Sequence, residues 1–201
     1  MDFDGAEKVR RLPAATHLTL AFRAIGQPSH GTATTMVENL GRGGCIRRDG
    51  RLTPVPPAWK MRRIVLGRGP VETMTIPWGD VSTAWYSTGI PNIEVFMAAP
   101  AALWLVSRLA RYLPGVLGSA MVQDFLKRRI DAGPAGPSPE ERRRGRSFLW
   151  GEVSDAAGNI ARASLEAPEG YELTAMTAWD IARRVAREDV AKAGFRTPSM
   201  L

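Results

Sequence analysis

Short alternations of apolar and polar residues mark several strands along the chain. Leu18, Leu20 and Phe22 alternate within residues 17–23, and a similar alternation follows residue 92 at Ile93, Val95 and Met97. A period of two places alternate side chains on one face of a strand. Both stretches are therefore predicted to be strands with one face toward the core.

Turn residues join most of the other predicted strands into hairpins. Asp49-Gly50 separates residues 46–48 from 51–53, residues 67–70 separate 60–66 from 71–76, and residues 155–159 separate 148–153 from 160–165. A two-residue Asp-Gly loop favours a type I′ turn because glycine accepts a positive φ. Short connections pair antiparallel strands. The predicted fold class is α+β, a mostly antiparallel mixed sheet with helices packed on one face and no Rossmann domain.

Helical spacing and capping residues predict the helices. We expect helices at residues 32–40 with a Gly41 C-cap, at 81–88 with an Asp80 N-cap, at 99–113, at about 117–130 and at about 172–191. Ser138-Pro-Glu-Glu141 matches a capping box with proline at the first helical position. Residues 131–139 are expected to form an exposed loop before it.

The chain of 201 residues, 44% of them hydrophobic, is expected to form a single domain, 1–201. The single cysteine, Cys45, excludes an intrachain disulfide and favours a reducing cytoplasm. The first dozen residues carry no secretion signal, and the longest charge-free apolar stretch, 95–107, is short of the length that crosses a bilayer. We expect a cytoplasmic protein, with contact to the inner face of the membrane left open.

The net charge of +7 and the pI of 10.3 favour partners that carry phosphate. Arginines concentrate between residues 127 and 146, but aromatic residues for base stacking do not accompany them. Nucleic-acid binding is therefore disfavoured against a solvated basic face. The neighbouring apolar stretch, 99–113, leaves two interpretations open, packing in the core or a dimer interface, and contact with an anionic membrane.

Motifs for common cofactor and metal sites are missing. A dinucleotide loop needs G-x-G-x-x-G between a strand and a helix, and the partial matches at residues 41–46 and 67–72 do not satisfy this spacing or context. Two histidines, His17 and His30, do not form a recognisable metal-ligand pattern, so no metal site is predicted. His30 could act as an acid or base near neutral pH, although a hydrogen-bonded role is favoured.

Residues 77–92 form the densest polar cluster, Pro77-Trp-Gly-Asp-Val-Ser-Thr-Ala-Trp-Tyr-Ser-Thr-Gly-Ile-Pro-Asn92. Hydroxyl, carboxyl, amide and aromatic side chains crowd a predicted turn into a helix and its exit, which is typical of a small ligand's pocket. The same residues also have structural interpretations, in which Asp80 caps the helix, Trp78 packs and Thr88-Gly89 terminates the helix.

Several segments together carry a family resemblance. They are Gly31-Thr-Ala-Thr-Thr-Met36, Arg48-Asp-Gly-Arg51, Ile76-Pro-Trp-Gly-Asp-Val-Ser-Thr83, Ser87-Thr-Gly-Ile-Pro-Asn-Ile-Glu-Val95, Trp150-Gly-Glu-Val153, Glu169-Gly-Tyr171 and Leu173-Thr-Ala175. From about residue 12 onward the chain resembles the C-terminal part of bacterial saccharopine dehydrogenase-like oxidoreductases, a group related to trans-acting enoyl reductases.

The resemblance implies an enzyme with an N-terminal Rossmann domain for NADP or NAD and a second, α+β domain on the substrate side. This chain is similar to the second domain alone, so we expect a substrate-binding and dimer-forming domain that is inactive without the missing cofactor domain. The implied ligand is a small polar or acyl substrate, and a homodimer is expected. The candidate residues are Asp80 and Tyr86 for catalysis, and Trp78, Ser82, Thr83, Asn92, Thr32 and Thr35 for substrate binding.

Two other interpretations remain at the level of sequence. A non-catalytic module could bind an anionic membrane surface or a protein partner through the basic and apolar helical region. The chain could also be a truncated reading frame without function. A glycine-rich strand, turn and helix encoded just upstream of Met1 would favour the oxidoreductase interpretation.

Overall fold

The computed structural model describes residues 12–40, 42–99, 101–109, 112, 114–187 and 194–200. Its strands are β1 (His17–Ala24), β2 (Gly44–Arg48), β3 (Arg51–Val55), β4 (Met61–Val65), β5 (Pro70–Thr75), β6 (Asn92–Ala98), β7 (Arg146–Ser154) and β8 (Ile160–Pro168). Its helices are α2 (His30–Glu38), α3 (Asp80–Thr88), α4 (Ala101–Leu109), α5 (Pro114–Leu117), α6 (Ala120–Asp131), α7 (Pro139–Arg144), α8 (Gly170–Ala186) and the 3₁₀ helix η1 (Pro198–Met200).

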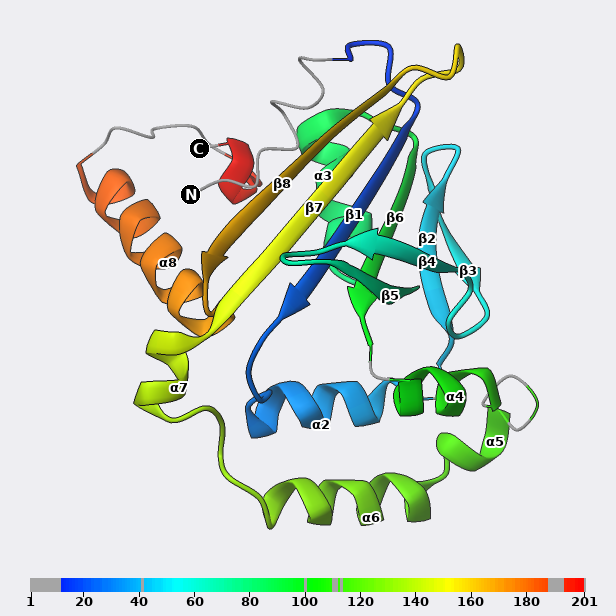
Figure 1. Cartoon of the computed structure of the whole chain (residues 1–201), viewed down its shortest axis with the longest axis vertical. Coiled ribbons are helices and arrows are strands. Elements are labelled where there is room, and N and C mark those ends of the chain that lie inside the picture. The colour runs from blue at the N-terminus through cyan, green and yellow to red at the C-terminus, as the bar shows by residue number, and fades with distance from the viewer. Residues whose placement is uncertain are drawn as a thin grey trace.

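All eight strands belong to one open, mixed sheet, which confirms the predicted α+β class (Figure 1). Six strands follow the order β3-β2-β6-β1-β7-β8, and β5 joins the sheet beside β6 with β4 on its other side. Central strand β1 pairs in parallel with β6 and antiparallel with β7. The other strand pairs are antiparallel. The expected mostly antiparallel sheet is therefore present.

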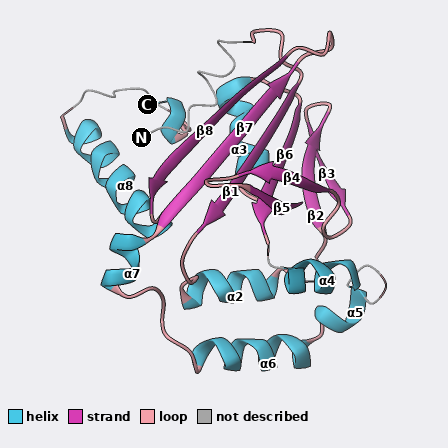
Figure 2. Ribbon diagram, in the orientation of Figure 1, coloured by secondary structure: helices cyan, strands magenta, loops and turns pink. Residues whose placement is uncertain are grey.

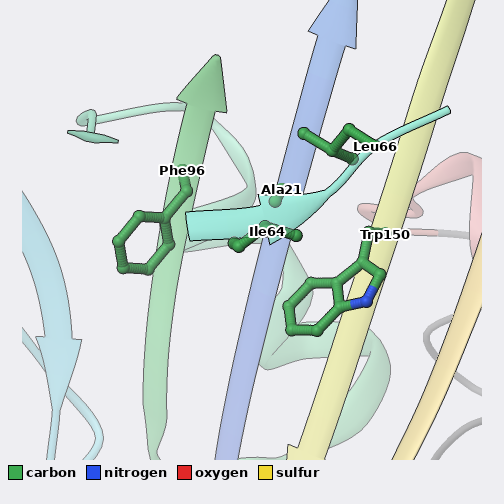
Figure 3. Packing of buried hydrophobic residues seen from close by; sticks show 5 residues of the cluster. All are labelled: Ala21, Ile64, Leu66, Phe96 and Trp150. Atoms are coloured by element: carbon green, nitrogen blue, oxygen red, sulfur yellow. The ribbon is translucent and has the colours of Figure 1, made fainter. Parts of the chain in front are cut away.

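The hairpin of β4 and β5 covers one face of the sheet. β5 pairs with β6 over only three residues, and the hairpin then turns across the strands, so that β4 lies in front of β1 (Figure 3). Ile64 and Leu66 thereby meet Ala21, Phe96 and Trp150 in a buried apolar cluster. The hairpin therefore buries the sheet face that carries Ala21. The alternation in β1 had predicted only the other face, with Leu18, Leu20 and Phe22, to be apolar.

Helix α3 covers the opposite face. Ala84 and Trp85 of the helix pack against a second buried cluster, which includes Leu18, Ile93 and Val153. The helices as a whole are distributed differently from the expected single covered face. Helices α2, α4, α5 and α6 gather at one end of the sheet, while α8 begins at the end of β8 (Figure 2).

The hairpin predicted from the Asp49-Gly50 pair is confirmed. Asp49 and Gly50 have φ values of 49° and 76°, the positive values that a type I′ turn requires. At the β4–β5 turn, Gly67 also has positive φ, and a Cβ there would lie 3.0 Å from the ring of Phe148. Glycine is needed at Gly67 because the turn rests directly on that ring.

Several predicted helix ends were wrong. The first helix begins at His30 and ends with Asn39 as its C-cap, because the Ser29 side chain accepts a hydrogen bond from the Thr32 N–H and starts the helix two residues early. Gly41, the expected cap, lies outside the described residues. The N-cap of helix α3 is Gly79, whose backbone is already helical, so Asp80 occupies the first helical position and not the N-cap.

The second half is also more divided than expected. The described residues between 99 and 130 form three helices in place of two, with Pro114 opening the short α5. The predicted loop covers residues 132–138, and the capping box at Ser138 and Glu141 is confirmed. The last helix starts at Gly170, two residues before the predicted start, because the Glu169 side chain accepts hydrogen bonds from two N–H groups of its first turn. The predicted end of this helix falls partly outside the described residues.

Candidate functional site

A pocket of about 750 Å³ opens where α2 and α4 meet the end of β5. This volume lies in the range of ordinary small-molecule sites. Its described lining residues are Ser29, Gly31, Thr32, Thr35, Met36, Asn39, Leu40, Gly43, Gly44, Pro57, Ala58, Met74, Thr75, Ile76, Pro77, Trp78, Met97, Leu103 and Ser107. None of these is charged, so the described walls favour a ligand that is largely apolar and needs hydrogen bonds at only a few points.

Helix α2 supplies the polar wall of the pocket. Thr32 and Thr35 are one turn apart and both line the cavity. The hydroxyl of Thr35 donates a hydrogen bond to the carbonyl of Gly31 at 2.9 Å, which fixes its orientation within the helix. Asn39 donates to the Thr35 carbonyl at 2.7 Å at the other end of this wall. The Thr35 hydroxyl is therefore positioned by the helix itself.

Three hydroxyls converge where α2 begins. The Ser29 N–H donates to the Tyr171 hydroxyl at 2.6 Å, and the Thr32 hydroxyl lies 2.9 Å from the same oxygen. The Ser29 and Thr32 hydroxyls are 3.1 Å apart. Burial opposes ionisation of Tyr171, but these hydrogen bonds outweigh it and leave the pKa of its phenol below the usual value. This hydroxyl cluster can present a hydrogen-bond donor to a ligand oxygen at one end of the pocket.

Residues 76–78 form the apolar wall opposite. The backbone of Ile76 still bonds to Val95 of β6, which holds the chain against the sheet as it leaves β5. The Trp78 ring is 44% exposed and packs at 5.2 Å between centroids against Phe22 at the end of β1. Trp78 therefore offers a broad, partly open aromatic surface to the cavity.

Asp80 lies just beyond this wall and is not among the described lining residues. Burial raises the pKa of its carboxyl above the ordinary aspartate value, and hydrogen bonding to its own backbone N–H opposes the rise only in part. The carboxyl makes no ion pair with a described residue. Such an environment favours the protonated form, a property shared by acids in active sites and by partly buried structural carboxyls.

The other α3 residues of the predicted site, Ser82, Thr83 and Tyr86, make contacts within the protein. Ser82 contributes its carbonyl to Arg47, and the Thr83 hydroxyl donates to the Gly79 carbonyl at 3.3 Å. Tyr86 is 60% exposed, and its ring meets that of Phe195 edge-on at 5.5 Å. None of these three side chains is among the described lining residues of the pocket.

Arg47 fixes the underside of α3. Its side chain is 7% exposed and donates to the carbonyls of Val81 at 3.0 Å and Gly50 at 2.7 Å. Its guanidinium also lies 5.2 Å from the centre of the Trp85 ring. The charge is compensated by carbonyl dipoles and the aromatic face, which ties the β2–β3 turn to the helix.

Asn92 closes the far end of the predicted cluster. Its amide nitrogen donates to the Thr16 carbonyl at 3.0 Å, and its amide oxygen accepts from the Asp49 N–H at 3.0 Å. Both bonding capacities therefore serve the start of β1 and the β2–β3 turn. In sum, the structure brings Trp78, Thr32 and Thr35 together at the pocket and leaves the other five predicted residues away from its described lining.

Sequence reasoning missed Ser29 and Tyr171 as site residues. Ser29 carried a local signal, since serine before a helical stretch is a common N-cap. Tyr171 carried none, because its contact with α2 joins residues 142 positions apart. The Nε2 atom of His30 lies 3.1 Å from the Gly133 carbonyl oxygen in the loop before α7.

The pocket does not fit the whole dinucleotide that the resemblance implies. A diphosphate needs cationic side chains or a glycine-rich turn at a helix start, and the described lining offers neither, since Ser29 already caps α2. Among the residues that the structure describes, no group of three or more His, Cys, Asp or Glu side chains is arranged to hold a metal ion. The described pocket is suited instead to one small organic ligand.

Exposed apolar side chains lie on α4 and α6, near the pocket's outer end. Leu105, Val106, Met121 and Phe125 are 53%, 39%, 83% and 61% exposed. The described helices include none with the length and apolarity to span a bilayer.

A scan against models of known protein families finds no match, and a search of the curated proteins finds none either. The resemblance drawn from the sequence segments therefore remains a prediction. The pocket and its hydroxyl cluster stand independently of it, since they follow from the positions of the side chains.

Proposed function

We propose that this chain provides the substrate-binding side of an NAD(P)-dependent oxidoreductase, with the pocket between α2, α4 and Trp78 as the substrate site. The observation that carries the proposal is the uneven chemistry of the cavity. Hydroxyls of Ser29 and Thr32 lie at one end, and apolar side chains such as Met36, Met74 and Met97 form most of the rest. Such walls suit an apolar substrate with a single carbonyl or carboxyl head group.

Each part of the site has a distinct role in this proposal. The hydroxyl cluster binds the substrate's oxygen, with Tyr171 tuning the hydrogen-bond strength of Thr32 from behind. Trp78 excludes water from the apolar part. NAD(P) would supply the hydride chemistry from a separate domain, as the family resemblance implies, because the described lining lacks a cradle for its diphosphate.

A neutral, apolar fluorescent dye, N-phenyl-1-naphthylamine, tests the pocket. We expect wild-type protein to bind it and Trp78→Ala to bind it roughly tenfold more weakly, because part of the apolar wall is lost. Trp179→Ala is the matched control, since Trp179 is 72% exposed on α8. Equal binding by wild type and Trp78→Ala would contradict the substrate site.

NADPH titration tests the assignment of the cofactor. We expect no saturable change in nucleotide fluorescence with this chain alone. Tight, stoichiometric binding of NADPH would overturn the division of labour between two domains. Adding the dye in the presence of NADPH separates the two questions, because the dye reports on the pocket whether or not nucleotide binds.

A second candidate function rests on the exposed apolar side chains of α4 and α6. The exposed arginines 142–144 on α7 could add attraction to an anionic membrane surface. Sedimentation with vesicles of anionic lipid tests this. Binding that is lost at high salt and in Arg142→Ala/Arg143→Ala/Arg144→Ala, but kept in the exposed control Arg48→Ala/Arg51→Ala/Arg63→Ala, supports a membrane-binding module. No sedimentation at low salt excludes it.

A further inference from the structure

Strand β8 forms one edge of the sheet and is unusually open for its length. It runs for nine residues, and among the described residues it pairs only with β7. Edge strands expose backbone N–H and C=O groups that can pair with another chain, and proteins commonly shorten or cover them. Helix α8 begins just after the end of β8, and the two elements then run apart from each other (Figure 1). Within the described part of the chain, all nine residues of this edge are therefore available to pair with another strand.

The backbone pattern identifies which groups point outward. In the β7–β8 loop the Asp155 N–H bonds to the Asn159 carbonyl, so residues 161, 163, 165 and 167 continue the alternation of bonds toward β7. Ile160, Arg162, Ser164 and Glu166 consequently direct their N–H and C=O groups away from the sheet. Their side chains share one face, and all four are exposed.

The outward residues are complementary to a copy of themselves. If two β8 strands pair antiparallel about Ser164, Arg162 of one copy lies opposite Glu166 of the other, and the reverse pair follows by symmetry. Centring the pair on Arg162 or on Glu166 would instead place like charges opposite each other, which is destabilising. Of the symmetric registers that bring the outward groups together, the one centred on Ser164 aligns all nine residues.

Charges on the neighbouring strand extend this complementarity. Arg162 lies 2.6 Å from Glu152 of β7, and Glu166 lies 3.7 Å from Arg146. Across the joined strands the order becomes Glu152, Arg162, Glu166 of the second copy and Arg146 of the second copy, so the sign alternates along the row. Exposed ion pairs add little energy each, but their alternation selects the register.

We propose that a second copy of this chain pairs with the β8 edge about Ser164, joining two sheets into one continuous sheet across a two-fold axis. Main-chain hydrogen bonds between the strands supply the affinity, and the Arg162–Glu166 pairs fix the register. This surface is separate from the pocket, so its test does not depend on the proposed substrate site.

Cysteine cross-linking tests the register. Cα atoms opposite each other in a hydrogen-bonded antiparallel pair are about 5.5 Å apart, within reach of a disulfide. Ser164→Cys should therefore form a disulfide-linked dimer on mild oxidation. Ile160→Cys, exposed on the same edge, should not, because the two copies of residue 160 would lie about 27 Å apart. Equal cross-linking of the two variants, or none with Ser164→Cys, would overturn the proposed register.

Analytical ultracentrifugation of the full chain tests the interface itself. We expect a monomer–dimer equilibrium whose dissociation constant rises at least about tenfold in Ser164→Pro, which removes an outward N–H at the two-fold axis. Glu166→Lys, which places like charges opposite each other, should weaken the dimer without touching the backbone. Leu52→Pro on the opposite edge strand is the control and should leave the dimer unchanged. Wild-type protein that stays monomeric, or dimers unaffected by both β8 variants, would overturn the proposal.

Discussion

The two ends of the polar segment 77–92 have different roles, one at the pocket and one in holding the fold together, although they form one cluster in the sequence. At the first end, Trp78 faces the pocket and packs on Phe22. At the other end, Asn92 uses both sides of its amide to hold Thr16 and Asp49. The nine residues of α3 lie between them, a length of about 13 Å.

This difference shows how polar residues can crowd a sequence for structural reasons. A helix bordered by two turns requires side chains that bond to backbone groups, and these are the same residue types that bind ligands. The helix then separates its two ends by more than the width of a small ligand. When a polar segment contains a helix, the residues before the helix and those after it are best considered separately as candidates for a ligand site.

The largest effect is expected at Arg47, which holds the middle of the segment. Arg47→Ala should lower the free energy of unfolding by about 3 kcal/mol, because the Val81 and Gly50 carbonyls lose a charged donor within a buried site. Urea unfolding followed by circular dichroism measures it. The exposed neighbour Arg48 is the control, and Arg48→Ala should change stability by less than about 0.5 kcal/mol. A loss below about 1 kcal/mol for Arg47→Ala would show that α3 does not depend on this side chain.

Asn92 should give the next largest effect and sharpen the structural role of the far end. Asn92→Ala should cost about 1–2 kcal/mol, since two backbone groups lose their partner, and should leave dye binding at the pocket unchanged. Asn159→Ala in the exposed β7–β8 loop is a milder control. If Asn92→Ala instead abolished dye binding while the fold kept its stability, the far end would belong to the ligand site.

Asp80 should show a smaller effect with a characteristic pH dependence. Because burial raises its folded-state pKa, the folded protein binds more protons than the unfolded chain between the ordinary and the raised pKa, and stability falls as pH rises through this window. Asp80→Asn should therefore be more stable than wild type at neutral pH and equal to it at pH below the ordinary aspartate value.

Asp155 should show the opposite dependence of stability on pH, because its pKa is lowered and not raised. Hydrogen bonding to Asn159 lowers the pKa of the Asp155 carboxyl, so its contribution is present at neutral pH and is lost on acidification. Asp155→Asn should be less stable than wild type at neutral pH. Unfolding curves at several pH values compare both variants, and a stabilising effect of Asp80→Asn that persists in acid would contradict the role of burial.

The smallest effect is expected at Tyr86. Its hydroxyl has no hydrogen-bond partner among the described residues, so Tyr86→Phe should change the free energy of unfolding by less than about 0.5 kcal/mol. Tyr86→Ala should lose about 1 kcal/mol with the Phe195 contact. A catalytic role for the hydroxyl would appear as lost turnover in Tyr86→Phe once a substrate is known, with stability unchanged.

Local signals predicted the elements whose bonds are local. The type I′ turn at Asp49-Gly50, the capping box at Ser138 and the αL residue Gly89 after α3 all follow from neighbouring residues. The parallel pairing of β1 with β6 and the crossing of β4 over the sheet could not be predicted in this way. They are decided by which distant apolar faces meet, as Ile64 and Phe96 do in the core.

The candidate site follows the same division. Trp78, Thr32 and Thr35 were named from sequence and line the pocket. The hydroxyl cluster was not, because Tyr171 contacts α2 across 142 positions of sequence, which no local pattern reveals. Asp80 departed from its expected cap because the preceding Gly79 adopts a helical backbone, which no rule for capping residues could have anticipated.

The central position of β1 has a consequence for biosynthesis. Its two neighbours are residues 92–97 and 147–154, so the first strand leaves the ribosome long before either neighbour exists. Before β7 is translated, Leu18 and Ala21 can contact only the residues of the β6 side, and Val153 and Trp150 of β7 complete the two clusters that bury them. Contacts between residues this far apart in the chain slow folding, so the central strand is completed only when residues 147–154 are present.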